Sequence, residues 1–166
     1  MAEFRPQAIL EVLDRHGVHY VLVGGLAAVL HGAVHVTTDV DIVPEEGKAN
    51  LERLSAALKE LGARIRVTGE PDGVPFDHGA ESLARVRMWN LTTALGDLDV
   101  TFEPSGTRGY EDLRRDVVTL ELRDLRVPVA SLADVIRSKE AAGRPKDREA
   151  LPALRELLTE QRRAGH

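Results

Sequence analysis

The sequence predicts a single α/β domain in which helices flank a β-sheet, and three stretches carry that prediction. The β-branched and aromatic run at residues 20–23 favours a buried strand. Gly24 and Gly25 end this run directly before a segment rich in alanine and leucine, which favours a helix. Apolar and polar residues alternate at residues 38–43 and again at 97–102, with the period of two that is typical of strands.

Length and composition exclude several classes of protein. With 166 residues, of which 43% are hydrophobic and 30% charged, the chain is long enough for one domain with a substantial core. No run approaches the roughly 18 apolar residues of a membrane span, and the first residues lack the apolar segment of a signal peptide. We therefore expect a cytoplasmic protein without a membrane partner. The absence of cysteine leaves carboxylates and histidines as candidate metal ligands and argues against zinc.

The glycine pair is placed to bind an anion. Gly24 and Gly25 precede the predicted helix, where backbone N–H groups lack intrahelical partners and the helix dipole is positive. Glycine also lets a phosphate approach the main chain closely. The alternative interpretation of this pair is a tight turn from strand to helix.

Two carboxylates on the following strand are candidate metal ligands. Asp39 and Asp41 alternate with apolar residues, so both side chains point to one face of the strand. They repel each other there, and hard divalent cations such as Mg²⁺ take oxygen ligands of this kind. Asp97 and Asp99 share a face of the later strand, and we prefer Asp99 as a third ligand because it lies inside the alternating segment. The alternative for these acids is a solvated strand face.

The remaining elements are assigned from periodicity and turn residues. Leucine spacing predicts an amphipathic helix over 48–61, and the alternation in 63–67 predicts a half-exposed or edge strand. Glycines and prolines dominate residues 68–84, which predicts a long loop of a kind that often carries function. The other predicted elements are a helix from Pro6 to Gly17, a strand near 86–91, a short helix at 110–115 and a hairpin of 117–122 with 126–129.

Two helices are predicted at the C-terminal end, over 131–142 and 147–163. We expect residues 1–130 to form the core and residues 131–166 to pack on it as a small helical part. Lys139 falls on the apolar face of the first of these helices. Its side chain therefore either extends to water or reaches a bound triphosphate.

These motifs together resemble the minimal nucleotidyltransferase superfamily, which shares its catalytic fold with DNA polymerase β. Gly24-Gly25, thirteen further residues, Asp39-Val40-Asp41 and the later Leu98-Asp99-Val100 follow the order of its signature. Residues 136–147 are similar to the helical segment that follows the sheet in the AbiEii-type toxin nucleotidyltransferases and related small families. The resemblance covers about residues 18–158 and implies a mixed β-sheet with flanking helices.

The resemblance also implies an activity and roles for these residues. The activity is transfer of a nucleoside monophosphate from a nucleoside triphosphate such as ATP to a hydroxyl, with release of pyrophosphate. Asp39 and Asp41 would coordinate Mg²⁺ and the triphosphate, while Asp99 would bind a second Mg²⁺ and help to deprotonate the acceptor hydroxyl. Mn²⁺ is the alternative cation. The glycine pair would hold the leaving phosphates.

One position departs from the family pattern. Gly25 stands where many relatives have a serine, so no side-chain hydroxyl is available there to hold a phosphate. Backbone donors, or the hydroxyls of Thr37 and Thr38, would have to bind the phosphates, and Lys139 is a further candidate for nucleotide binding.

The acceptor is the least determined part of the prediction. The resemblance favours a tRNA 3′ end, in the manner of toxin nucleotidyltransferases, with a cognate antitoxin or toxin protein as a partner. A net charge of −5 argues against non-specific adhesion to nucleic acid, although a local basic patch could still hold a polyanion. Other candidate acceptors are a protein hydroxyl and a small molecule such as an aminoglycoside.

A non-catalytic module that binds a nucleotide or a partner protein is the alternative to an enzyme. Three retained carboxylates argue against it, because a degenerate fold has no need to keep repelling acids together. For His31, His35 and Trp89 we expect structural roles, because the histidines lack the spacing of a recognised metal motif. For the basic residues near 144–148 we expect a solvated charged turn, with a nucleotide or RNA contact as the alternative.

Overall fold

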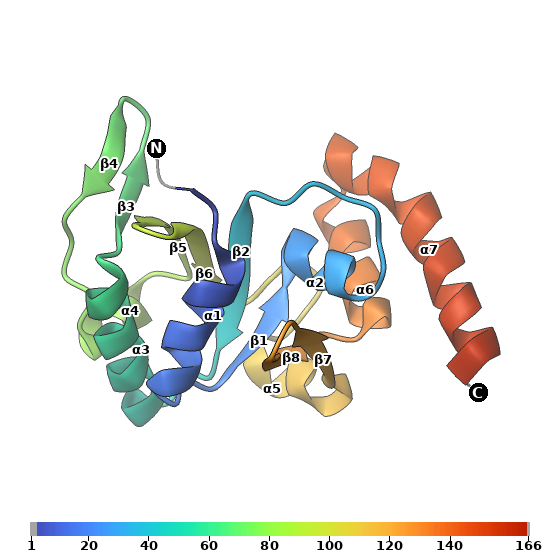
Figure 1. Cartoon of the computed structure of the whole chain (residues 1–166), viewed down its shortest axis with the longest axis horizontal. Coiled ribbons are helices and arrows are strands. Elements are labelled where there is room, and N and C mark those ends of the chain that lie inside the picture. The colour runs from blue at the N-terminus through green and yellow to red at the C-terminus, as the bar shows by residue number, and fades with distance from the viewer. Residues whose placement is uncertain (1–2, 166) are drawn as a thin grey trace.

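The computed structural model describes residues 3–165 and contains one mixed β-sheet (Figure 1). Its strands are β1 Tyr20–Val23, β2 Asp39–Pro44, β3 Arg64–Val67, β4 Glu70–Val74, β5 Met88–Thr93, β6 Gly96–Thr101, β7 Val118–Leu122 and β8 Leu125–Val129. Within the described range they join in the order β4-β3-β5-β6-β2-β1-β8-β7. β2 runs parallel to β6 and antiparallel to β1, which confirms the predicted α/β class with a mixed sheet.

Seven helices flank this sheet in the part of the chain that the structure describes. They are α1 Pro6–Arg15, α2 Gly24–Leu30, α3 Lys48–Leu61, α4 Ala80–Arg85, α5 Tyr110–Leu113, α6 Leu132–Ala142 and α7 Pro145–Gly165, with a 3-10 turn at Arg114–Asp116. α1 packs on α3 and contacts β2 and β8, whereas α6 packs along α7 and contacts α2 (Figure 1). The C-terminal helices therefore stand at the end of the molecule opposite α3 and α4.

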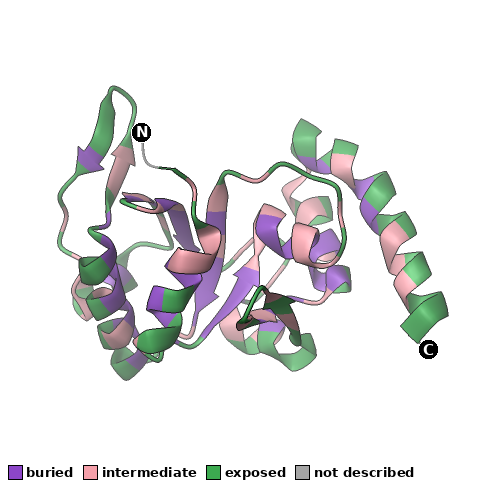
Figure 2. Ribbon diagram, in the orientation of Figure 1, coloured by how far each residue is buried: buried purple, intermediate pink, exposed green. Residues whose placement is uncertain are grey.

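Side-chain alternation on β2 and β6 separates an apolar face from an acidic face. The two strands pair in register, so that Asp39 lies opposite Asp97 and Asp41 lies opposite Asp99. By strand alternation, the residues between the acids point to the other face. They are buried and belong to the core; Figure 2 colours the buried parts of the ribbon purple. On the face opposite the acids, four residues of these strands have no exposed surface: Val40, Ile42, Leu98 and Val100.

The stretch 68–84 is not the long loop that its composition predicts. β4 forms a hairpin with β3, and α4 follows it. Gly73 has a φ of +73°, and a Cβ there would lie 2.7 Å from the carbonyl oxygen of Ile65, so glycine permits the close pairing. β4 covers β3, which is therefore not the edge of the sheet. The sequence does not predict β4, because four of its five residues are exposed and the strand therefore has no apolar face.

Local caps set both ends of α6 as predicted. The Ser131 hydroxyl accepts a hydrogen bond from the Asp134 amide at 3.1 Å, and Gly143 ends α6 in the left-handed conformation with a φ of +62°. α7 begins at Pro145, a residue whose ring suits the first turn of a helix. Among the residues that the structure describes, no helix combines the length and apolar character needed to cross a membrane.

Candidate active site

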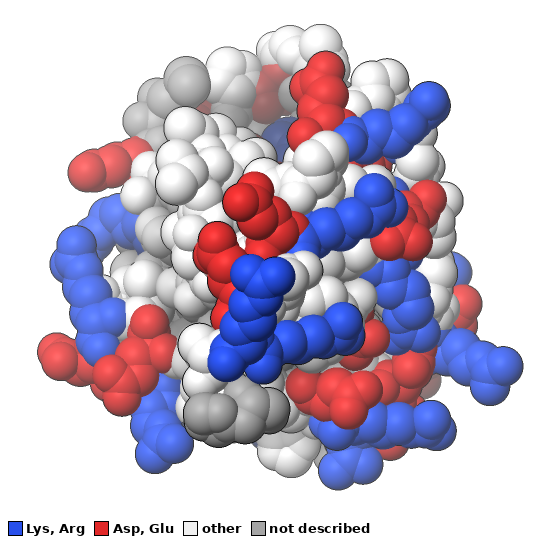
Figure 3. Space-filling model, turned by 90° about the vertical axis from the view of Figure 1, so that its right-hand side faces the viewer, with Lys and Arg blue, Asp and Glu red and all other residues white. Residues whose placement is uncertain are grey.

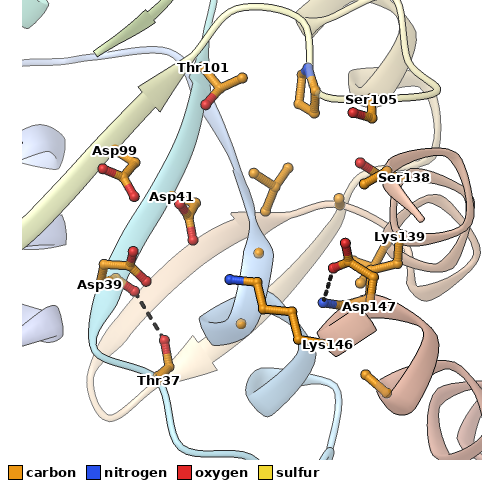
Figure 4. A pocket seen from close by; sticks show the side chains of 18 of the residues that line it. Thr37, Asp39, Asp41, Asp99, Thr101, Ser105, Ser138, Lys139, Lys146 and Asp147 are labelled. Carbon is orange, nitrogen blue, oxygen red and sulfur yellow. Dashed lines mark hydrogen bonds and ion pairs between the residues drawn. The ribbon is translucent and has the colours of Figure 1, made fainter. Parts of the chain in front are cut away.

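Three carboxylates from two strands meet on the acidic face of the sheet (Figure 4). Asp39 and Asp41 come from β2 and Asp99 from β6, and one oxygen atom of each lies within 4.8 Å of the others. Alternation along β2 points its two acids to the same side, and the register of the parallel pair brings Asp99 beside Asp41. This group includes Asp99, as preferred from the sequence, whereas Asp97 lies outside it.

Burial and repulsion from neighbouring acids disfavour the ionised forms of Asp41 and Asp99. Burial, followed by repulsion from Asp39 and Asp99, raises the pKa of Asp41 to about 8. Burial and the interaction with Asp39 raise the pKa of Asp99 to about 6, against the opposing effect of Arg66. A divalent cation would offset this repulsion, and a donor set made only of oxygen atoms suits Mg²⁺. The acids therefore fit the metal that the family resemblance implies.

Arg66 on β3 holds the far side of the carboxylate group. Its Nη2 atom donates a hydrogen bond to Oδ1 of Asp99 at 2.9 Å. Its Nη1 atom donates to the carbonyl oxygen of Leu91 at 3.1 Å and lies 3.3 Å from Oδ2 of Asp97. The guanidinium thus forms ion pairs with both acids of β6, Asp97 and Asp99, from the side opposite β2.

Gly24 and Gly25 start α2 next to the carboxylates. Gly24 has a φ of +76°, and a Cβ there would lie 2.8 Å from Cγ of Asp41 and closer still to its Oδ2. At Gly25 a Cβ would lie 3.0 Å from Nε2 of His35 and 3.2 Å from Oγ1 of Thr37. Any side chain at Gly24 would therefore displace Asp41, and the pair keeps the main chain accessible beside the acids.

The segment between α2 and β2 lines one side of the same space. The Thr37 hydroxyl donates a hydrogen bond to the carbonyl oxygen of Asp39 at 3.1 Å, which fixes the approach to β2. Thr38 and His35 line the cavity beside it. His31 has the structural role expected from the sequence, because its Nε2 atom lies 2.8 Å from the carbonyl oxygen of Ala130.

A basic wall faces the carboxylates across the cavity (Figure 4). Lys139 comes from α6, Arg144 directly precedes α7 and Lys146 lies in its first turn, and all three line the cavity. Asp147, which is fully buried, accepts a hydrogen bond from Nε of Arg144 at 2.7 Å and lies 3.6 Å from Nζ of Lys139. Although burial acts to raise it, the bonds and charge of Arg144 hold the pKa of Asp147 below its usual value.

The cavity between the two walls is large enough for a nucleotide-sized ligand. Its volume is about 620 Å³, within the range of small-molecule sites. Beyond the basic wall it is lined by hydroxyls from three segments, those of Thr101, Ser105 and Ser138 (Figure 4). All seven residues predicted from the sequence line this one cavity: Gly24, Gly25, Thr38, Asp39, Asp41, Asp99 and Lys139. Their roles stay predictions.

The sequence does not predict a place in the site for two polar residues, Arg66 and Asp147. The alternation around Arg66 indicates only a half-exposed strand. The pairing of β3 with β5, which brings Arg66 close to Asp99, cannot be read from the residues next to Arg66. The sequence assigns no role in the site to Asp147, whereas in the structure its carboxylate pairs with Arg144 and Lys139. Trp89 has a structural role, because its indole N–H donates to the carbonyl oxygen of Leu83 at 3.1 Å and its ring packs on Phe76.

Comparison with known proteins agrees with this geometry. A family model described as "Nucleotidyltransferase of unknown function (DUF6036)" matches residues 6–158. No curated protein matches the chain. A crystal structure of the lincosamide antibiotic adenylyltransferase LnuA with lincomycin bound superposes with a TM-score of 0.61 at 18% identity, covering 93% of this chain and 99% of that one. A putative nucleotidyltransferase from Thermotoga maritima gives a TM-score of 0.57 at 17% identity, covering 96% and 97%. At these identities the two structures support the fold alone.

Proposed function

The chain belongs to the nucleotidyltransferase family DUF6036, and from this membership we propose that it transfers a nucleoside monophosphate from a nucleoside triphosphate to a hydroxyl and releases pyrophosphate. One observation carries the proposal: three carboxylates with oxygen atoms within 4.8 Å of one another line a cavity that basic side chains also line. A bound triphosphate needs the carboxylates and the basic side chains together. The carboxylates hold the cations that neutralise its charge, and the basic side chains bind and orient its phosphates.

Asp39, Asp41 and Asp99 would hold the divalent cations, with Mg²⁺ as the first candidate and Mn²⁺ as the alternative. When bound, such cations stabilise the charge that develops on the attacking and leaving oxygens of an in-line displacement. Asp99 would also accept the proton of the attacking hydroxyl.

The phosphates would lie between the glycine pair and the basic wall. Main-chain N–H groups at Gly24 and Gly25, with the hydroxyl of Thr38, would donate hydrogen bonds from one side. Lys139, steadied by Asp147 at 3.6 Å, would bind the departing pyrophosphate from the other. These groups hold the triphosphate, and the choice of acceptor depends on the remaining lining.

Two acceptors follow from different observations. The resemblance to AbiEii-type toxins favours a tRNA 3′ end, with a cognate antitoxin as partner. A small-molecule hydroxyl is favoured by the similarity over 99% of the length of LnuA, a lincosamide antibiotic adenylyltransferase. On the face that carries α7, positive and negative side chains are intermingled (Figure 3), so that face offers no continuous basic surface for a nucleic-acid backbone.

Transfer assays separate these possibilities. The purified protein is incubated with each α-labelled nucleoside triphosphate and Mg²⁺, together with tRNA, with total cell protein, or with a panel of hydroxylated antibiotics. We expect label in one class of acceptor, and its loss in Asp41→Asn but not in the surface control Asp72→Asn. Nucleotide binding without transfer to any acceptor would contradict the enzymatic proposal and support a binding module.

A further inference from the structure

Arg66 is the cation that contacts the candidate metal ligands most directly. Its guanidinium is fixed by Oδ1 of Asp99 at 2.9 Å, Oδ2 of Asp97 at 3.3 Å and the carbonyl oxygen of Leu91 at 3.1 Å. The side chain is 35% exposed, so it lies at the boundary between the sheet face and solvent. It is therefore held in place, yet it has room to move outward.

The sheet register explains how Arg66 reaches this position. Ile65 pairs with Leu91 across β3 and β5, and Asn90 pairs with Asp99 across β5 and β6, so the residue after Ile65 lies in line with Asp99. Arg64 shares the strand, the face and the charge of Arg66. Its guanidinium instead donates to the carbonyl oxygen of Gly73 at 3.4 Å.

A divalent cation at Asp99 and the guanidinium of Arg66 compete for the same carboxylate. Like charges a few ångströms apart repel strongly where water is partly excluded. On the metal role assigned under the proposed function, we propose that Arg66 is a counter-ion that neutralises Asp99 in the nucleotide-free enzyme and that a divalent cation must displace from Asp99. Arg66 is thus a positioning residue that sets the affinity of the site for metal.

Asp97 has a defined part in this exchange. It shares the face of Asp99 on β6, its oxygen is 3.3 Å from Nη1 of Arg66, and it lies outside the carboxylate group. When Arg66 leaves Asp99, it can keep its ion pair with Asp97 and its hydrogen bond to the carbonyl oxygen of Leu91. The two acids of β6 therefore have different partners: Asp99 binds the metal, and Asp97 keeps the guanidinium of Arg66.

The proposal predicts a change in metal affinity that needs no turnover. Binding of Mn²⁺ to the nucleotide-free protein is measured by the electron paramagnetic resonance signal of the free ion. We expect Arg66→Gln to lower the dissociation constant about tenfold, because it removes the competing charge. Arg66→Lys keeps a charge but loses the planar fork that spans both acids, and we expect a gain of about threefold. Arg64→Gln, the matched control, should stay within about twofold of wild type.

The sign of the effect separates this role from a structural one. If Arg66 only holds Asp99 in place, Arg66→Gln weakens Mn²⁺ binding, and that result overturns the proposal. An equal gain in Mn²⁺ affinity in Arg64→Gln also overturns the proposal, because the loss of any positive charge on β3 would then explain the result. Thermal melts establish that each variant is folded, and if Arg66→Gln is not, the threefold gain in Arg66→Lys decides the question. Absence of Mn²⁺ binding in every variant contradicts the proposed metal chemistry itself, whereas equal binding in wild type and Arg66→Gln contradicts only the role of Arg66.

Discussion

Replacement of a candidate metal ligand is expected to stabilise the metal-free protein at alkaline pH. Asp41 lies among acids whose oxygens are within 4.8 Å, and its pKa of about 8 means that it loses its proton only under alkaline conditions. Asparagine has nearly the same shape and carries no charge. In Asp41→Asn the repulsion between residue 41 and its two acidic neighbours is therefore absent at every pH.

The size of the gain follows from the geometry. Two unit charges 4.8 Å apart repel by roughly 3.5 kcal/mol at an effective dielectric constant near 20. Arg66 beside Asp99 offsets part of this, so we expect a net gain of about 2 kcal/mol at pH 9. For a chain of this size about 2 kcal/mol corresponds to a rise of roughly 4–8 °C in melting temperature.

The dependence on pH gives the prediction a second readout. The folded-state pKa of Asp41 lies above its ordinary value of 3.8, so the folded protein keeps a proton that the unfolded chain has lost. Wild-type stability should therefore fall as the pH rises from about 4 to about 8. At pH 5 the wild type has lost only a small part of this stability, so the gain in Asp41→Asn should be much smaller than at pH 9.

The measurement is a thermal unfolding series in EDTA between pH 5 and pH 9. The control is Asp72→Asn, which removes one negative charge from the exposed strand β4 and should change the melting temperature by less than about 1 °C. The reasoning is refuted if Asp41→Asn is destabilised at pH 9, or if its shift is the same at pH 5 and pH 9.

Three further predictions concern ligands and the glycine turn. Mg²⁺ with a nucleoside triphosphate should raise the melting temperature of the wild type, and Asp99→Asn should lose most of that rise in the same thermal scan, since the ligand binds the folded state through this acid. Gly24→Ala should cost about 1–2 kcal/mol in a denaturant titration and reduce transfer at least tenfold, because alanine at a φ of +76° is strained and its Cβ would overlap Asp41. Lys139→Met should weaken triphosphate binding roughly tenfold in an equilibrium titration while Asp147 stays paired with Arg144; unchanged binding would remove Lys139 from the phosphate site.

The central part of the fold can be predicted because its periodicity is local. The alternation in 38–43 and 97–102 assigns both the strands and the face on which the acids lie, and the structure places strands there. The caps at Ser131 and Gly143 are likewise local, since each acts on backbone groups within one turn.

Register and exposed strands escape prediction because they depend on distant partners. β4 lacks an apolar face, so nothing in 70–74 distinguishes it from a loop before β3 is in place to pair with it. From the sequence alone Arg66 is interpreted as a solvated residue, because its contact with Asp99 depends on the alignment of β3, β5 and β6. Asp147 is hidden for a related reason, because its burial depends on Lys139 and on the packing of α6 against α7.

The acids of the site are kept together by the residues that point away from them. A slip of one residue between β2 and β6 would turn every side chain to the opposite face, exposing the apolar residues and burying the acids. Each fully buried valine, isoleucine or leucine contributes roughly 1.5–3 kcal/mol. Four such residues on the face opposite the acids, Val40, Ile42, Leu98 and Val100, have no exposed surface. Together they outweigh a repulsion of a few kcal/mol, so the apolar face fixes the register in which Asp41 meets Asp99.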